Sequence, residues 1–304
     1  MPSVDDVKTI FNSRIAVKTQ EDSSDSEQPK VKLFWEVYDE FTKECVRQTD
    51  WTEATKKKFK TLRNHLITFK KLNSFDFLTE KGLNDLVDSF RNKKGMLNST
   101  IKKEIGYLNW FLKWAANKGY NTNLAYASFS PKLKNTQAKV IFLTDEELEA
   151  IKKFQIPENK KYLKRVRDMF IFCCYTSLRH SDVYNLRRSD IKENHIEITT
   201  IKTQDSLIIE LNKYTRAIID KYKEIEFKDY KALPVISNQK MNEYIKELAK
   251  LAKIETPVRI TQYKGHERID TVYPKHELLS THTGRKTFIC KALSLGIPPN
   301  VVMK

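Results

Sequence analysis

Apolar residues recur at the spacing of one helical face in four successive segments between Val31 and Gly119. Repeats of three and four residues place such side chains on one side of a helix, so each segment is predicted to bury one stripe. Thr52, Thr79 and Asn98 stand before the second, third and fourth segments and are the predicted N-caps. Together the four segments predict a compact helical domain. The predicted stripes are Leu33, Phe34, Val37, Tyr38 and Phe41; Phe59, Leu62, Leu66 and Phe69; Leu83, Leu86, Val87 and Phe90; and Ile101, Ile105, Leu108, Phe111 and Leu112.

Two polar stretches on either side of this region lack any apolar period. Residues 1–31 contain the acidic, serine-rich run Gln20–Pro29 and are predicted to be a flexible lead-in. Residues 130–139 are polar and basic, which predicts a linker. The chain is therefore predicted to hold two domains, 32–129 and 140–304.

From residue 140 onward, short helices alternate with strands. Thr144 and Glu147 have the spacing of a capping box and predict a helix start. Two runs rich in β-branched residues flank a polar bend at Lys202, which predicts a β-hairpin over 195–211. The fold class is thus mainly α: a helical domain followed by a mixed α/β domain with small β-hairpins. Further helices are predicted at 166–175, 180–186, 213–222 and 240–252, with a second strand pair at 258–263 and 268–273.

The charge balance narrows the class of partner. The 304 residues include 55 Lys and Arg against 39 Asp and Glu, a formal charge of +16. Such a surplus favours a polyanion. Since the sequence has no long apolar run for a membrane span and no secretory signal, nucleic acid is favoured over lipid. A merely basic soluble protein is the alternative that composition leaves open.

The four cysteines point to a reducing compartment. Cys45, Cys173, Cys174 and Cys290 have no disulfide-framework spacing, and three of them lie in helical or apolar patterns. They are predicted to be reduced core residues of a cytoplasmic protein. A zinc site made of Cys173, Cys174 and His180 is a weaker alternative, because the usual Cys-x-x-Cys spacing is absent.

Two stretches carry candidate chemistry. His282 and Arg285 lie one helical turn apart, so both can reach one point. The apolar pattern that follows predicts a helix with an apolar face made of Phe288, Ile289, Ala292, Leu293 and Leu295. The apolar run Phe170–Tyr175 breaks at a turn that carries Arg179, and Asp182, three residues on, could orient the guanidinium. A guanidinium binds two phosphoryl oxygens in a fork, and an imidazole bonds an oxygen or moves a proton. The set suits a phosphodiester transition state, although His-x-x-Arg alone is more often an exposed helix start.

This ordered set resembles a known family. The run Thr176–Asp182 with Arg179 inside it, a hairpin lysine and a later His-x-x-Arg are similar to the tyrosine recombinases, or phage integrases, particularly those of Bacteroides-type mobile elements. The resemblance spans roughly residues 32 to 304. It implies that Arg179 and Arg285 clamp the phosphate with His282 beside them. It also implies that Lys202 protonates the leaving 5′ oxygen.

The resemblance implies a site-specific DNA recombinase or integrase acting in DNA integration. Strands would be cleaved and rejoined through a 3′-phosphotyrosyl intermediate by a homotetramer on double-stranded DNA. The covalent link conserves the bond energy, so no nucleotide cofactor is expected, and arginines take the place of a metal. DNA-bending accessory proteins are further candidate partners, and no membrane partner is expected. The resemblance assigns 32–129 to core-site binding and 140–304 to catalysis.

The sequence departs from the family at its end. In the family a further His or Trp and then the nucleophilic tyrosine follow the second arginine, whereas this sequence stops at Lys304, in what looks like the opening of a helix. We therefore expect a chain cut short before its nucleophile and inactive alone. Lys286 and Gly284 replace a histidine and a leucine of many relatives, without loss of a catalytic group. A type IB topoisomerase-like enzyme and a non-catalytic DNA-binding regulator derived from an integrase are the alternatives.

Basic residues on polar helix faces and in the linker are the predicted contacts to DNA phosphates. Such charges are often only solvated, so the prediction concerns the patch more than any one member. The candidates are Lys56, Lys60, Arg63, Lys102, Lys103, Lys132 and Lys134.

Overall fold

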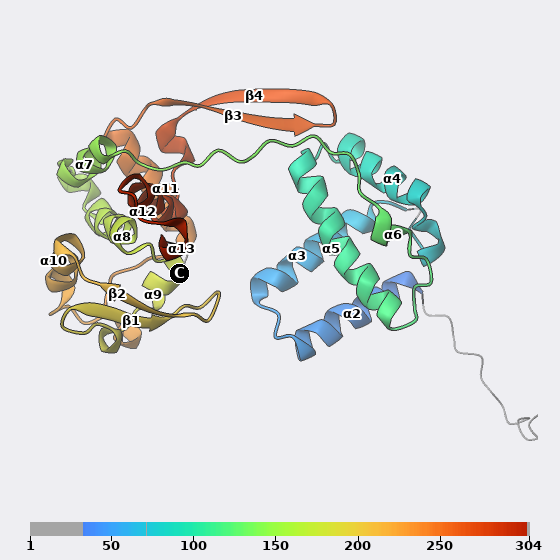
Figure 1. Ribbon diagram of the computed structural model, residues 1–304, viewed down its shortest axis with the longest axis horizontal. Helices are drawn as coiled ribbons and strands as arrows, with labels where there is room; N and C mark the ends of the chain where they lie inside the picture. Colours follow the sequence, from blue (N-terminus) through green and yellow to red (C-terminus); the bar gives the residue numbers. More distant parts are fainter. Residues whose placement is uncertain (1–32, 71, 303–304) are drawn as a thin grey trace, which may run out of the picture. The chain divides into compact units, whose positions relative to one another are not determined.

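The computed structural model describes residues 33–70 and 72–302. Contacts along the backbone divide the chain into two compact units, Met1–Lys134 and Asn135–Lys304, and the boundary falls within the predicted linker. Each unit has its own apolar core. Both consist mainly of helices, and the strands form two small antiparallel hairpins (Figure 1). The predicted fold class is therefore confirmed.

The first unit is a set of helices that each bury one stripe. Every residue of the predicted stripes is buried except Leu33, which is 64% exposed. Leu33 is the N-cap residue of the first described helix, where its backbone N–H donates to Glu36 at 2.9 Å, so it precedes the buried stripe. The elements are α2 (Phe34–Gln48), α3 (Glu53–Ile67), η1 (Phe75–Phe77), α4 (Glu80–Asp88), η2 (Ser89–Lys93), α5 (Asn98–Asn117) and α6 (Ala125–Ser128).

Two of the three predicted N-caps are confirmed. The hydroxyl of Thr52 accepts from the backbone of Thr55 at 3.3 Å, and that of Thr79 accepts from Gly82 at 3.2 Å. The prediction for Asn98 was wrong, because Asn98 is the first residue of α5. Its side chain is buried and donates to the carbonyl of Lys134 at 2.8 Å, so a tertiary contact takes precedence over capping.

The second unit is organised around α8. Its apolar run from Phe170 to Cys174 is buried, and α10, α11 and α12 all pack against this helix (Figure 1). The helices are α7 (Asp145–Lys153), η3 (Glu158–Lys160), α8 (Tyr162–Thr176), α9 (His180–Asn185), η4 (Arg188–Asp190), α10 (Lys213–Tyr222), η5 (Lys228–Tyr230), α11 (Asn238–Leu251), η6 (Lys275–Leu278), α12 (Thr281–Ser294) and α13 (Pro299–Val302).

Two antiparallel hairpins complete this unit. The strands β1 (His195–Thr199) and β2 (Ser206–Glu210) pair with Ile196 opposite Ile209. The strands β3 (Pro257–Lys264) and β4 (Glu267–Pro274) pair with Ile260 opposite Thr271. An isolated two-stranded hairpin is marginal in water, so each needs an anchor in the core. The buried side chains of Ile196 and Val258 provide it.

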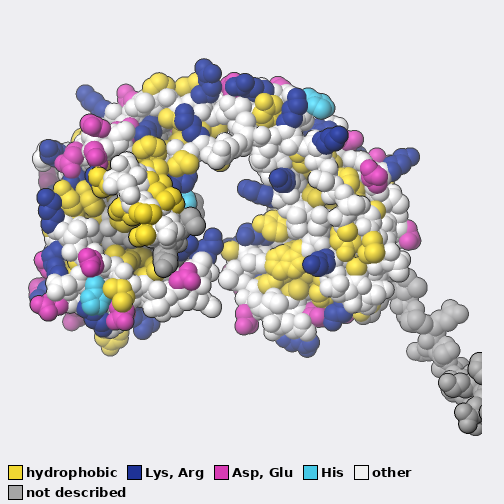
Figure 2. Space-filling view, viewed as in Figure 1, with side chains coloured by type: hydrophobic (Ala, Val, Ile, Leu, Met, Phe, Trp, Pro, Cys, Tyr) yellow, Lys and Arg dark blue, Asp and Glu magenta, His cyan; other side chains and the backbone are white. Residues whose placement is uncertain are grey.

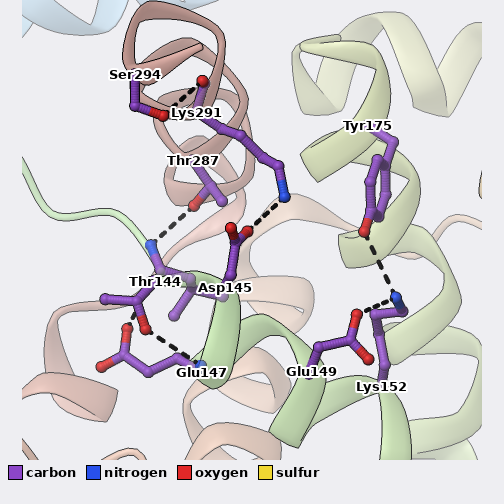
Figure 3. A network of polar contacts seen from close by, with 10 residues as sticks. Thr144, Asp145, Glu147, Glu149, Lys152, Tyr175, Thr287, Lys291 and Ser294 are labelled. Atoms are coloured by element: carbon purple, nitrogen blue, oxygen red, sulfur yellow. Dashed lines mark hydrogen bonds and ion pairs between the residues drawn. The ribbon is translucent and has the colours of Figure 1, made fainter.

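Helix α12 lies against α8 and the start of α7 (Figure 3). The predicted capping box is confirmed: Thr144 accepts from the backbone of Glu147 at 3.3 Å, and the Glu147 carboxylate accepts from the backbone of Thr144 at 2.9 Å. The Thr287 hydroxyl of α12 accepts from the backbone of Leu143 at 3.0 Å. An ion pair between Lys291 and Asp145 adds a second link.

The buried face of α12 differs from the predicted apolar face. Of the predicted residues Phe288, Ile289, Ala292, Leu293 and Leu295, only Ala292 is fully buried, and Leu295 is 71% exposed. Small residues line the contact instead because the helices lie very close together. A Cβ added to Gly284 would be 2.9 Å from the Cβ of Cys173. The buried residues are Thr281, Thr283, Gly284, Thr287 and Ala292.

The surface is rich in Lys and Arg side chains over both units (Figure 2). No helix in the described part of the chain is long and apolar enough to cross a bilayer. All four cysteines are free thiols, and Cys45, Cys173 and Cys174 are buried, as predicted, while Cys290 is half-buried. The described residues contain no cluster of His, Cys, Asp and Glu that could hold a metal ion, so the zinc alternative has no support.

Gly284→Ala should destabilise the second unit by about 1 to 3 kcal/mol, because the new methyl group overpacks the contact with Cys173. The matched control is Gly106→Ala on α5, where an added Cβ meets nothing within 4 Å. That change should stabilise the first unit by about 0.5 to 1 kcal/mol through helix propensity. Denaturant unfolding of both variants tests this, and equal stability changes would contradict the close approach of α12 to α8.

Candidate active site

The turn between α8 and α9 is shaped by a residue in a left-handed conformation. Ser177 follows the last residue of α8 with φ of 60°, a region that non-glycine residues seldom adopt. Its N–H donates to the carbonyl of Cys173 at 3.1 Å and ends the helix. This conformation places the Ser177 carbonyl against α12, where it accepts from Nη1 of Arg285 at 2.6 Å. Nothing in the sequence marks Ser177 for this role.

Two guanidinium groups meet at this turn. Arg179 is the N-cap residue of α9 and is half-buried, as is Arg285 on the first turns of α12. Burial and then the positive charge of Arg179 lower the pKa of Arg285, while the carboxylate of Asp182 opposes them. An arginine remains charged under such shifts, so the site holds a partly buried guanidinium that stays positive beside a second one. Such an arrangement is suited to an anion.

Asp182 has a different contact from the one predicted. Its buried carboxylate accepts from the backbone N–H of Ile201 at 3.0 Å, in the bend of the β1–β2 hairpin. Among the described residues it forms no hydrogen bond with Arg179, and its negative charge instead acts on the guanidinium of Arg285. The expected orientation of Arg179 by Asp182 is therefore replaced by a tie between α9 and the hairpin. The other carboxylate oxygen is buried without a hydrogen-bond partner in the described part of the chain.

The hairpin bend carries Lys202, as predicted from the strand pattern. A threonine pair closes the bend: the hydroxyls of Thr200 and Thr203 lie 2.8 Å apart, and Thr200 also bonds the backbone of Asp205 through both its N–H and its hydroxyl, at 2.9 and 3.2 Å. Lys202 itself is exposed. Ile201 directly precedes Lys202, so its hydrogen bond to Asp182 fixes the backbone of the bend relative to the turn that carries Arg179.

His282 lies at the meeting point of these elements. Partial burial lowers the pKa of its imidazole, and four positive charges add to the effect: Lys286, Arg285, Arg179 and Lys202, in decreasing order. These charges come from α12, the turn before α9 and the hairpin bend. The structure thus brings the other three predicted catalytic residues, Arg179, Lys202 and Arg285, within electrostatic reach of the His282 imidazole. At neutral pH that imidazole is uncharged and can donate or accept a hydrogen bond.

Arg179 and Arg285 also line a pocket of about 790 Å³ together with Tyr175. Tyr175 is the tyrosine to consider as an internal nucleophile. Its hydroxyl accepts from Nζ of Lys152 at 3.5 Å (Figure 3), and its ring stacks on Tyr214 with centroids 4.4 Å apart. Burial raises the pKa of Tyr175, which disfavours the phenolate. This side chain is held as part of a packed cluster.

The candidate DNA contacts on α3 differ in their exposure and in whether they form ion pairs. Lys60 is exposed, whereas Lys56 is paired with Glu53 at 2.7 Å. The guanidinium of Arg63 binds both carboxylate oxygens of Asp39, at 3.2 and 3.5 Å, and covers the ring of Trp35. Lys60 is thus the α3 candidate best placed to meet a phosphate, and Arg63 also has a structural role.

The remaining candidates lie on α5 and in the connecting segment. Lys102 and Lys103 are exposed on the polar side of α5, opposite its buried stripe. Lys132 and Lys134 are exposed in a stretch without regular structure, where the backbone of Lys134 is fixed by Asn98. All four ammonium groups are accessible to a polyanion.

His282 should titrate with a midpoint below the usual value of about 6.5. Because the folded-state pKa is below the unfolded one, protonation favours unfolding, and stability falls as the pH drops from the unfolded value through the folded one. NMR of the imidazole protons, assigned by loss of the signal in His282→Gln, measures the midpoint. Adding inorganic phosphate should raise it, because an anion offsets the four cations. A midpoint at or above 6.5 without phosphate would contradict the convergence of charges.

No protein-family model matches the sequence, and no curated protein matches it. Among solved structures, a lambda integrase dimer bound to a COC′ core site matches with a TM-score of 0.65 at 14% identity, covering 90% of each chain. A lambda integrase tetramer bound to a Holliday junction matches with a TM-score of 0.63 at 13% identity, over 98% of this chain and 85% of that one. A Tn1549 transposon integrase in complex with circular intermediate DNA gives 0.60 at 15% identity, over 88% and 90%. At these identities the comparison establishes the fold: this chain has the tyrosine recombinase fold.

Proposed function

We propose that this protein is a site-specific DNA recombinase of the tyrosine type. The observation that carries the proposal is the convergence of Arg179, Lys202, His282 and Arg285 on one side of the second unit, in a fold shared with integrases. A cluster of positive charges at a helix N-terminus favours an anion, and the backbone of DNA is the anion that matches a protein of charge +16. The proposal therefore rests on the site as well as on the fold.

Each residue has a role that follows from its position. Arg179 and Arg285 hold the non-bridging oxygens of the scissile phosphate and stabilise the added charge of the pentacoordinate transition state. The Ser177 carbonyl occupies one nitrogen of Arg285 and leaves the rest of its donor fork for the phosphate. Neutral His282 hydrogen-bonds a phosphoryl oxygen or accepts the proton of the attacking hydroxyl. Lys202 donates a proton to the leaving 5′ oxygen.

The attacking group is a tyrosine hydroxyl. It bonds to phosphorus, the 5′ oxygen leaves with a proton, and a 3′-phosphotyrosyl link remains; attack by the 5′ hydroxyl of another strand reverses these steps. The 13 tyrosines of this chain include Tyr175 near the arginines, but its hydroxyl contacts Lys152 and its pKa is raised. We place the nucleophile after residue 304. It acts in the same chain or from a neighbour in a tetramer on double-stranded DNA.

The two units divide the work. Residues 32–129 bind the core site, with Lys56, Lys60, Arg63, Lys102 and Lys103 as phosphate contacts. The segment 130–139 follows the DNA backbone through Lys132 and Lys134, and residues 140–304 carry out catalysis. The integrases of mobile elements are the setting that we propose for this activity, in the cytoplasm, with DNA-bending proteins as accessory partners.

Binding to duplex DNA should depend steeply on salt. If the protein neutralises about 6 to 10 phosphates, affinity should fall by about 10³- to 10⁵-fold between 50 and 200 mM salt. Lys60→Ala should lower the slope of log affinity against log salt by about one. Lys161→Ala is the control, because Lys161 is exposed and paired with Glu158 at 2.8 Å in the second unit. Fluorescence anisotropy titrations measure both slopes, and a flat salt response would rule out the proposed mode of binding.

Loss of either arginine should impair cleavage far more than binding. In a chain that includes the nucleophile, Arg179→Ala and Arg285→Ala should each slow strand cleavage on bound DNA by about 10²- to 10³-fold, as expected for removal of one charge-stabilising donor. Lys60→Ala should weaken affinity modestly and leave cleavage of bound DNA unchanged. Single-turnover cleavage of a labelled site at saturating protein separates the two effects. If all three variants lose only affinity, the arginines are ordinary phosphate contacts.

A further inference from the structure

The N-terminal turns of α11 contact the first residue of α12 through two asparagines. The side-chain oxygen of Asn242 accepts from the backbone N–H of Thr281 at 2.8 Å. The side-chain oxygen of Asn238 accepts from the hydroxyl of the same threonine at 2.9 Å. Thr281 is buried and directly precedes His282. Two hydrogen bonds from one helix therefore fix the residue next to the imidazole.

These two hydrogen bonds stabilise the N-terminus of α12, where backbone N–H groups and positive charge gather. The first N–H groups of a helix have no partner inside the helix, and the helix dipole leaves partial positive charge there. His282, in this first turn, is also within electrostatic reach of positive charges on Arg179 and Lys202 from other elements and on Arg285 and Lys286 of the same helix. Because like charges oppose an ordered first turn, its position depends on acceptors from outside the helix. Asn242 supplies one without adding a negative charge that would occupy the anion site.

The segment that leads into α11 also contacts the turn that carries Arg179. The backbone carbonyl of Ile236, two residues before α11, accepts from Nε2 of His180 at 2.9 Å. His180 is the residue after Arg179 and is half-buried. Burial lowers the pKa of His180, which favours the neutral ring that donates this bond. Residues 236–242 thus contact the neighbours of both Arg179 and His282.

The helix α11, which carries both asparagines, is anchored in the core of the second unit. The helix α11 buries Met241, Ile245, Leu248 and Ala249 in the core of the second unit and packs against α8. Met241 precedes Asn242 directly, so the asparagine is carried by a residue that is only 1% exposed. A displacement of Asn242 would require repacking of that core.

We propose that Asn242 and Asn238 are positioning residues that set the first turn of α12, and with it His282 and Arg285, in the geometry for a phosphodiester. The catalytic part of this inference rests on the proposed recombinase function, but the positional part does not. Neither asparagine is proposed to contact DNA. They act through Thr281, and Asn242 has the larger effect because it caps a backbone N–H.

Three variants and one control test the proposal. Asn242→Ala removes the acceptor, Asn242→Asp keeps it, and Asn238→Ala removes the second bond. Gln239→Ala is the control, because Gln239 is exposed on the same turn of α11. The first readout is the NMR midpoint of His282, which needs no DNA. Asn242→Ala should move it up toward 6.5, since a displaced first turn takes the imidazole away from Arg179 and Lys202, which lie on other elements. Asn238→Ala should move it less, and Gln239→Ala should leave it unchanged.

The second readout is cleavage by a chain that includes the nucleophile. On saturated DNA, Asn242→Ala should slow cleavage about tenfold to a hundredfold, as expected for misplacement of reacting groups. Asn242→Asp keeps the acceptor but adds a negative charge beside the anion site, so it should not restore the full rate. An unchanged His282 midpoint in Asn242→Ala overturns the positioning role, whatever the cleavage rate. If the midpoint shifts but the chain that includes the nucleophile cleaves no DNA even without substitution, the result supports positioning and refutes the proposed function. If Asn242→Ala does not fold, the same comparison is made with Asn238→Ala and Thr281→Val, and unchanged midpoints in both overturn the proposal.

Discussion

The close packing of α12 on α8 is the contact on which the rest of the site depends. Gly284 lets the two helices approach within a distance that a methyl group would block. That approach brings Arg285 to the carbonyl of Ser177, at the point where α8 ends in a left-handed residue. The next residues of the turn carry Arg179. One backbone contact between helices therefore places two guanidinium groups from residues more than a hundred positions apart in the sequence.

This arrangement concentrates positive charge, and the structure counters the resulting repulsion with neutral acceptors and one buried carboxylate. The carbonyl of Ser177 and the amides of Asn238 and Asn242 hold the cationic elements without neutralising them. Asp182 ties the hairpin to α9 and partly offsets the charge around Arg285. Partial burial and then the positive potential that remains lower the pKa of His282. A phosphate that enters the site would lower the electrostatic energy of the whole cluster, which links binding to preorganisation.

Much of the fold could be predicted from the sequence, because local patterns determine it. The capping box at Thr144, the hairpin bend at Lys202 and the buried stripes of the first unit each follow from spacing within a few residues. The predictions that were wrong concern tertiary contacts. Asn98 binds a distant carbonyl instead of capping its helix, and α12 buries threonines and a glycine instead of its larger apolar residues. No local pattern identifies which partner such residues will meet.

We propose that these residues activate a DNA phosphodiester for attack by a tyrosine hydroxyl that lies outside residues 1–304. The most direct test is a suicide substrate, labelled at the strand that would remain attached, incubated with residues 1–304 alone and with a chain that continues through the expected tyrosine. Denaturing gel electrophoresis separates free DNA from protein-linked DNA. We expect a protein-linked band only with the longer chain, with the link at a 3′ phosphate. A linked band from residues 1–304 alone would place the nucleophile inside them, and intact DNA binding without any link from the longer chain would identify a DNA-binding regulator instead of an enzyme.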